Sequence, residues 1–151
     1  MTKFSERKID NLLKIIRSKL LEYQKSESYD FREFIDEKSW RIRKGVLNFP
    51  GAYVVFEENE PIYVGSAGKG KHLLKYRIQD LFHDYRAKNE ERKYYHTLTS
   101  KLLKYRFNSL NEIRNFYIKK CRIKIVETET VTQARIIETI LIELLKPRFN
   151  S

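Results

Sequence analysis

At 151 residues, with 41% hydrophobic and 13% aromatic side chains, the chain is sized for one folded domain and is unlike a disordered segment. Its single cysteine excludes a disulfide framework and a cysteine-based zinc site. No apolar run reaches the roughly 20 residues of a membrane span and no signal-peptide core is found, so we expect a cytoplasmic protein without a membrane partner. The net charge of +11 arises wholly from residues 61–124, which hold 16 Lys/Arg and 5 Asp/Glu, while the rest holds 15 of each sign. Such a segment attracts polyphosphate, although a lysine-rich surface without a ligand explains the composition equally well.

The first third of the chain is predicted to be mainly helical. Apolar side chains recur at helical spacing over residues 4–24, which predicts an amphipathic helix. The stretch that follows is ambiguous, with one short helix expected around residues 30–37. Pro50-Gly51 is the strongest break in this half of the chain. We therefore divide the chain into an N-terminal helical extension, residues 1–49, and a second domain, residues 50–151.

From residue 50 onward the pattern predicts a mixed fold. Two β-rich runs flank the polar turn 57–61 and predict a hairpin, and a third strand follows late in the chain. The last predicted helix has Thr130 or Thr132 as its N-cap and ends before Pro147. The strands are expected over residues 52–56, 62–64 and 121–127, and the helices over residues 72–88, 95–107, 110–119 and 130–145. The predicted fold class is α+β, a small three-stranded antiparallel sheet flanked by helices.

Two charged side chains lie on otherwise apolar helix faces. Glu138 has apolar residues one turn away on both sides, and Arg77 follows Leu73 and Leu74 and precedes Leu81. Burying an unpaired carboxylate is too costly to be tolerated, so Glu138 requires a cationic partner. Two interpretations stay open. Arg77 and Glu138 form a structural ion pair, or the carboxylate binds a metal while the guanidinium binds a phosphate.

The hairpin carries a pair of tyrosines. If its turn centres on Glu58, Tyr53 and Tyr63 lie directly opposite each other on one face of the sheet, with Cβ atoms ~5 Å apart. Two adjacent phenols can orient or activate a water molecule. Paired tyrosines on a sheet are more often packing residues, so both interpretations remain.

The loop over residues 65–71 joins a strand to a helix and is rich in glycine and lysine. It lacks the phosphate-loop pattern because His72 occupies the last position, which excludes a nucleotide triphosphatase of that type. Lys69 and Lys71 are nevertheless expected to touch DNA phosphates.

Together these positions resemble one family, the GIY-YIG nucleases. The order of the motifs, their strand–strand–helix context and the interval between Glu138 and Asn150 all agree with the family pattern. The resemblance covers residues 50–151. The residues that carry it are Gly51-Ala52-Tyr53, Tyr63-Val64-Gly65, Arg77, and the closing stretch Glu138, Leu141-Ile142, Lys146-Pro147, Phe149-Asn150.

The resemblance implies a set of catalytic residues. Glu138 would be the sole protein ligand of a Mg²⁺ ion, or of Mn²⁺ in its place. Tyr53 would deprotonate or orient the attacking water, assisted by Tyr63. Arg77 would neutralise charge on the phosphoryl oxygens. Asn150 would fix the end of the last helix and the metal environment.

The chain departs from the family pattern at several positions. Ala52 replaces a bulkier residue. Ser66 occupies a place often held by lysine, so Lys69 or Lys71 must substitute if that charge matters. Leu81 stands where many members have tyrosine or histidine, and His83 or His96 is the expected source of the missing polar group.

DNA is the expected partner, and RNA stays open because backbone electrostatics do not distinguish the two polymers. The basic residues expected to contact nucleic acid are Lys69, Lys71, Lys75, Arg86, Lys101 and Lys104.

The expected function is a divalent-metal-dependent DNA endonuclease, in the first instance a type II restriction enzyme acting as a homodimer. A homing, phage or repair-type nicking nuclease and a non-catalytic nucleic-acid-binding module on the same fold are the alternatives.

Overall fold

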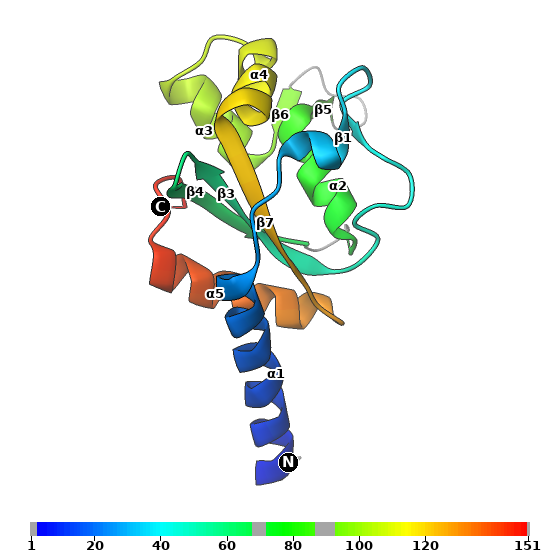
Figure 1. The fold of residues 1–151 in the computed structure, drawn as a ribbon, viewed down its shortest axis with the longest axis vertical. Helices are drawn as coiled ribbons and strands as arrows, with labels where there is room; N and C mark the ends of the chain where they lie inside the picture. The colour runs from blue at the N-terminus through cyan, green and yellow to red at the C-terminus, as the bar shows by residue number, and fades with distance from the viewer. Residues whose placement is uncertain (1–2, 68–71, 87–92, 151) are drawn as a thin grey trace.

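The fold is built on one three-stranded antiparallel sheet (Figure 1). The structure is a computed structural model and describes residues 3–67, 72–86 and 93–150. The central strand β3 pairs with β4 on one side and β7 on the other, so β4 and β7 are edge strands. The strands span Gly51–Glu57 (β3), Glu60–Ser66 (β4) and Cys121–Glu127 (β7). The predicted α+β class with a small antiparallel sheet is confirmed.

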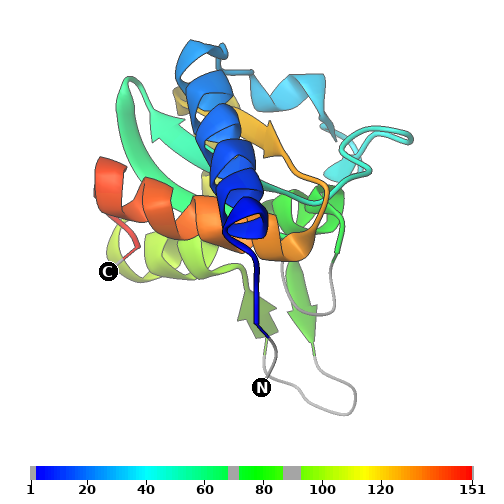
Figure 2. The same ribbon diagram turned by 90° about the horizontal axis from the view of Figure 1, so that it is seen from below.

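Helices cover both faces of this sheet (Figures 1 and 2). α1 and α5 lie against one face and share a core with Val54, Val64 and Val126. α2, α3 and α4 enclose the other face, where Tyr53 and Val55 are buried. The helices span Glu6–Lys25 (α1), Leu74–Gln79 (α2), Thr97–Tyr105 (α3), Leu110–Lys120 (α4) and Val131–Leu145 (α5). None of the helices in the described ranges is long and apolar enough to cross a membrane.

α5 begins and ends where the sequence predicts. Thr130 is its N-cap, and the side chain of Thr130 accepts the backbone N–H of Gln133 at 3.1 Å. At the other end Lys146 adopts the left-handed conformation with a φ of 47°, and Pro147 follows. This helix carries Glu138 at its middle.

The register of the β3–β4 hairpin differs from the expected one by a bulge. Ile62 is an extra residue on β4 between the turn and the rest of the ladder. As a result Tyr53 pairs with Gly65, and Tyr63 pairs with Val55. The two tyrosines are therefore not directly opposite, but they share a face with ring centroids 6.3 Å apart.

The predicted helix over residues 72–88 is wrong in its second half. α2 ends at Gln79, a single 3-10 turn η2 (Asp80–Phe82) follows, and the chain then enters a strand. This strand, β5 (Asp84–Arg86), pairs with β6 (Lys93–Tyr95) in a separate two-stranded sheet. The apolar periodicity stops with η2, so the residues after it have no apolar helix face to bury.

The helix expected around residues 30–37 is only one 3-10 turn, η1 (Phe31–Glu33). It leads into a short hairpin of β1 (Ile35–Asp36) and β2 (Arg41–Ile42). Phe31 and Ile35 are completely buried in the core that also contains Tyr53. The N-terminal extension thus helps to enclose the sheet face on which the tyrosines lie.

Candidate active site

Tyr53 and Tyr63 lie on the sheet face that α2 and α3 cover. Tyr53 has no solvent-exposed surface, whereas Tyr63 keeps 7% of its surface exposed. The ring of Tyr53 passes over Gly65, where any Cβ atom would overlap the phenol. The glycine is therefore required for the phenol to reach this position.

The hydroxyl of Tyr53 is hydrogen-bonded to His96, whose Nε2 lies 2.5 Å from the phenol oxygen. His96 is fully buried and is the N-cap of α3, where its Nδ1 accepts the backbone N–H of Leu98 at 3.0 Å. The imidazole also meets the Tyr63 ring edge to face, with centroids 5.2 Å apart. One buried imidazole thus contacts both phenols.

Tyr63 has two further polar neighbours. Arg77 of α2 and Thr97 of α3 both lie close enough to the phenol to lower its pKa. The guanidinium of Arg77 also lies 4.0 Å from the carboxylate of Asp80, one turn further along the chain. Arg77 is half-buried, which limits the solvent screening of its charge. A fixed positive charge therefore lies beside the phenol.

Burial raises the pKa of both phenols. Desolvation raises the pKa of Tyr53 well above its ordinary value, and a negative charge on Tyr63 would raise it further. Desolvation also raises the pKa of Tyr63, with the positive charge of Arg77 opposing the rise. The charges of Arg77 and Glu138 act on both pKa values, so the four side chains form one electrostatic unit. Both phenols are neutral at neutral pH.

Glu138 approaches this unit from α5, on the opposite face of the sheet. Its carboxylate is half-buried, and Oε2 accepts a hydrogen bond from the Ser66 hydroxyl at 2.6 Å. Ser66 is the last residue of the edge strand β4, so this bond fixes the carboxylate at the end of that strand. Ser66 therefore contributes a hydroxyl donor at the position where we noted the absence of a lysine.

Asn150 pairs its side-chain amide with the backbone of Val64, the residue after Tyr63. The Val64 N–H donates to Oδ1, and Nδ2 donates to the Val64 carbonyl, both at 2.8 Å. The N–H of Phe149 donates to the carbonyl of Ile62 at 2.9 Å. The C-terminal tail thus covers the open edge of β4. The side chain of Asn150 is therefore bonded to the strand that carries Tyr63, and its expected role at the end of the last helix and at the metal stays a prediction.

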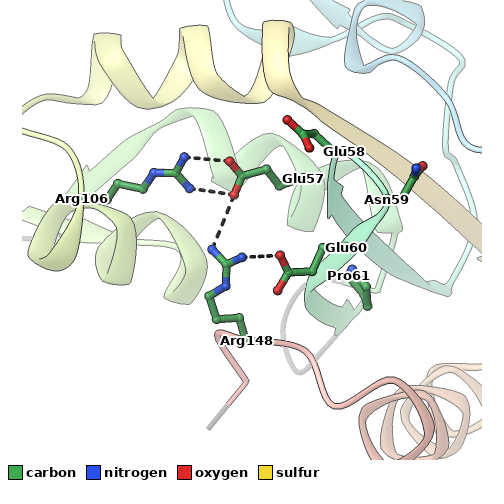
Figure 3. Close-up of a pocket in the computed structure, with 7 residues that line it drawn as sticks. All are labelled: Glu57, Glu58, Asn59, Glu60, Pro61, Arg106 and Arg148. Carbon is green, nitrogen blue, oxygen red and sulfur yellow. Dashed lines mark hydrogen bonds and ion pairs between the residues drawn. The ribbon is translucent and has the colours of Figure 1, made fainter.

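The tail is anchored a second time at the hairpin turn (Figure 3). A cleft of about 780 Å³ opens there. Arg106 donates two hydrogen bonds to the Glu57 carboxylate, both at 2.7 Å, and Arg148 bridges Glu57 and Glu60. The arginines and these two carboxylates neutralise one another. The network therefore ties Arg148, and with it the nearby Asn150, to the hairpin.

Lys101, expected to contact nucleic acid, has a structural partner. Its Nζ donates to the backbone carbonyl of Phe149 at 2.8 Å and is half-buried. This bond links α3 to the tail. The contact of Lys101 with nucleic acid stays a prediction, beside this structural bond.

The other basic residues expected at the nucleic acid are only partly described. Lys75 and Lys104 each lie over the tyrosine ring that follows them, at 5.0 and 5.1 Å from the ring centroid. Arg86 is described through its backbone, as the last residue of β5. Lys69 and Lys71 lie outside the described residues.

The imidazole at the phenols belongs to His96 and not to His83. The Nε2 atom of His83 lies 2.6 Å from the backbone carbonyl oxygen of Trp40, which occupies that nitrogen. Leu81 is a fully buried core residue. The imidazole beside the phenols therefore lies at the start of α3 and not on the element that carries Leu81. Sequence reasoning kept His96 only as an alternative, noted Ser66 only as the loss of a lysine and missed Thr97. Local spacing does not show which separate elements pack against each other.

Glu138 and Ser66 offer only hard oxygen atoms to a ligand. Mg²⁺ prefers such atoms and retains several waters when few protein groups bind it. In residues 3–67, 72–86 and 93–150, no three His, Cys, Asp or Glu side chains converge on a common point. A metal held by one carboxylate, with water and substrate completing the shell, fits this set of donors.

Comparison with protein-family models and with curated proteins gives no match. Among solved structures, the chain is similar to the GIY-YIG N-terminal endonuclease domain of UvrC from Thermotoga maritima, crystallised with its catalytic magnesium. The two are 18% identical, with a TM-score of 0.39, over 69% of this chain and 85% of that chain. Identity and TM-score are both too low for residue roles to be transferred.

Proposed function

We propose that this chain is a divalent-metal-dependent endonuclease that hydrolyses phosphodiester bonds in DNA. The observation that carries the proposal is the contact of Tyr53, Tyr63 and His96 on one sheet face, with Arg77 and Glu138 near enough for their charges to act on the Tyr63 pKa. The positive charge of Arg77 opposes the rise in the Tyr63 pKa, and the negative charge of Glu138 adds to that rise. The same residues carry the resemblance to GIY-YIG nucleases in the sequence. The positive charge concentrated in residues 61–124 supports a polyanionic substrate.

In the proposed reaction a water oxygen bonds to phosphorus while the bond from phosphorus to the 3′ oxygen breaks. Tyr63, as the phenolate, takes one proton of the water, and the leaving oxygen is protonated from solvent. The raised pKa of Tyr63 makes its phenolate a scarce but strong base. We assign the water to Tyr63 and not to Tyr53 because only Tyr63 keeps exposed surface. Arg77 neutralises charge that develops on the phosphoryl oxygens.

Glu138, oriented by Ser66, is the residue that would hold Mg²⁺ or Mn²⁺. When bound, the metal would supply Lewis-acid stabilisation of the leaving oxygen. Asn150 holds the edge strand β4 in place by two hydrogen bonds. Because Tyr63 lies on this strand, Asn150 helps to fix the distance between the Tyr63 phenol and the Glu138 carboxylate.

Plasmid cleavage tests this proposal. Supercoiled DNA should be cut with Mg²⁺ and remain intact with a chelator. Arg77→Ala should lower the single-turnover rate by about 10²–10³-fold, as loss of a transition-state donor does. Arg135→Ala, at an exposed position of α5, is the matched control and should cut at the unchanged rate. Absence of cleavage with every divalent metal tested would contradict the proposal.

The finer proposal is a type II restriction enzyme acting as a homodimer. The exposed apolar residues on the N-terminal half of α1 support it, since Leu13 is 60% and Ile9 47% exposed and the helix extends beyond the sheet (Figure 1). A two-fold dimer presents two sites to the two strands of a palindrome. Such a dimer should convert supercoiled plasmid to linear with little nicked intermediate. Accumulation of nicked circles would favour a homing, phage or repair-type nicking enzyme.

The complete burial of Tyr53 supports a second candidate, a nucleic-acid-binding module without activity. In that case DNA binding should weaken steeply with salt while no cleavage occurs. Competition with tRNA distinguishes an RNA ligand from DNA.

A further inference from the structure

We infer that His96 is a positioning residue that donates its Nε2 hydrogen to Tyr53 and so makes Tyr53 a hydrogen-bond donor towards Tyr63. The consequence for catalysis rests on the proposed function, but the hydrogen-bond assignment does not.

The protonation of the ring follows from its two partners. Nδ1 of His96 accepts the backbone N–H of Leu98 at 3.0 Å, so Nδ1 carries no hydrogen. A neutral imidazole has one N–H, which must then be on Nε2. Nε2 lies 2.5 Å from the Tyr53 oxygen. The imidazole is therefore the donor in this bond, and the phenol oxygen is the acceptor.

The phenol hydrogen of Tyr53 is consequently left for a second acceptor. Tyr53 has no exposed surface, so bulk water cannot accept this hydrogen. Tyr63 is the neighbouring phenol, with its ring centroid 6.3 Å away, and its charge affects the pKa of Tyr53 more than any other charge does. A hydrogen donated in this direction favours the anionic form of Tyr63, the form that takes a proton from water.

The start of α3 holds both phenols in this arrangement. His96 is the N-cap of the helix, and Thr97, the next residue, lies close enough to Tyr63 to lower the pKa of that phenol. The N-terminal end of a helix also favours negative charge nearby. A single helix end therefore sets the direction of one phenol hydrogen and stabilises the phenolate of the other.

The first test needs no activity. In the full chain labelled with ¹⁵N, imidazole nitrogen shifts should identify Nε2 of His96 as protonated and Nδ1 as an acceptor. In Tyr53→Phe the Nε2–H proton signal should move upfield, because the hydrogen bond to the phenol oxygen is lost. A protonated Nδ1 would overturn the inference, whether or not the protein cuts DNA.

The second test separates the role of His96 as the N-cap of α3 from its role in positioning Tyr53. His96→Asn keeps a good N-cap but is too short to reach Tyr53. It should reduce the single-turnover rate by about 10-fold, and Tyr53→Phe by about 10²-fold, within the range for a preorganised donor. The double variant should be no slower than Tyr53→Phe alone. Tyr117→Phe, an equally buried phenol bonded to Thr99 at 2.8 Å, is the control whose effect should be independent of His96→Asn.

Failure of the inference and failure of the proposed function give different results. If the wild-type chain cuts DNA but the effects of His96→Asn and Tyr53→Phe multiply, His96 does not act through Tyr53 and the inference fails alone. If the wild-type chain cuts no nucleic acid, the proposed function fails, while the nitrogen shifts still decide the hydrogen-bond assignment.

Discussion

The side-chain amide of Asn150 forms two hydrogen bonds, both 2.8 Å long, with the backbone N–H and carbonyl of Val64. β4 is an edge strand, so without Asn150 these two groups would face away from the sheet unpaired. A residue at the end of the chain therefore holds the strand segment between Tyr63 and Gly65.

Replacing Asn150 should affect stability and activity together. Asn150→Ala removes two hydrogen bonds at a half-buried position, and we expect it to lower the free energy of unfolding by about 1–3 kcal/mol. Asn150→Asp keeps the acceptor for the Val64 N–H and should lose less. Urea denaturation measures both. A change of less than ~0.5 kcal/mol for the alanine variant would mean that the tail does not hold β4.

Replacing each of the two tyrosines by phenylalanine should lower the cleavage rate to a different extent. Tyr63→Phe removes the proposed base and should reduce the cleavage rate by about 10²–10⁴-fold. Tyr53→Phe removes a donor behind it and should cost less. Single-turnover rates with saturating enzyme compare them directly. Equal and small losses would return both tyrosines to a packing role.

The Glu57–Arg106 pair predicts a dependence of stability on acid pH. The hydrogen bonds from Arg106 lower the pKa of Glu57 below its ordinary value of 4.5. The stabilisation is therefore present above the unfolded-state pKa and is lost as pH falls through 4.5 towards the folded-state value. As the pH falls from 6 to 3, the melting temperature of the wild type should drop by roughly 2–4 °C more than that of Glu57→Gln. Glu58→Gln, at the exposed neighbouring position, should follow the wild type.

The exposed half of α1 predicts self-association. Leu13→Glu places a charge at a 60% exposed apolar position and should shift a dimer to monomer without changing the far-UV circular dichroism. Asn11→Glu, at the exposed position two residues earlier, is the control and should leave the dimer intact. Sedimentation measures both. A wild-type monomer at all concentrations would remove the support for a restriction-type dimer.

The sequence predicted the parts of the fold that depend on local periodicity. α1, α3, α4, α5 and all three strands of the sheet were located correctly, because each has a clear apolar period and a defined end such as Thr130 or Pro147. The helix predicted over residues 72–88 was wrong because Asp84–Arg86 pairs with Lys93–Tyr95, a contact that local periodicity does not report. The hairpin register was wrong because a bulge at Ile62 has no sequence signal of its own.

The candidate site shows the same limit. Tyr53, Tyr63, Arg77 and Glu138 were selected from motif order and helix position, and their catalytic roles stay predictions. The contacts of His96 with Tyr53 and of Ser66 with Glu138 cross 43 and 72 residues of sequence. Only the packing of α3 and α5 on the sheet brings those pairs together. Orientation and burial, which decide which phenol meets water, likewise follow from tertiary structure alone.

The measurement that tests the central claim most directly is single-turnover DNA cleavage by the wild type and Glu138→Gln across a range of Mg²⁺ concentrations. Glutamine keeps the size of the side chain and an acceptor for the Ser66 hydroxyl, but it lacks the charge that a hard cation requires. We expect Mg²⁺-dependent cleavage by the wild type, none by Glu138→Gln, and DNA binding by both. Cleavage by Glu138→Gln at the wild-type rate would contradict the assignment of the metal to this carboxylate.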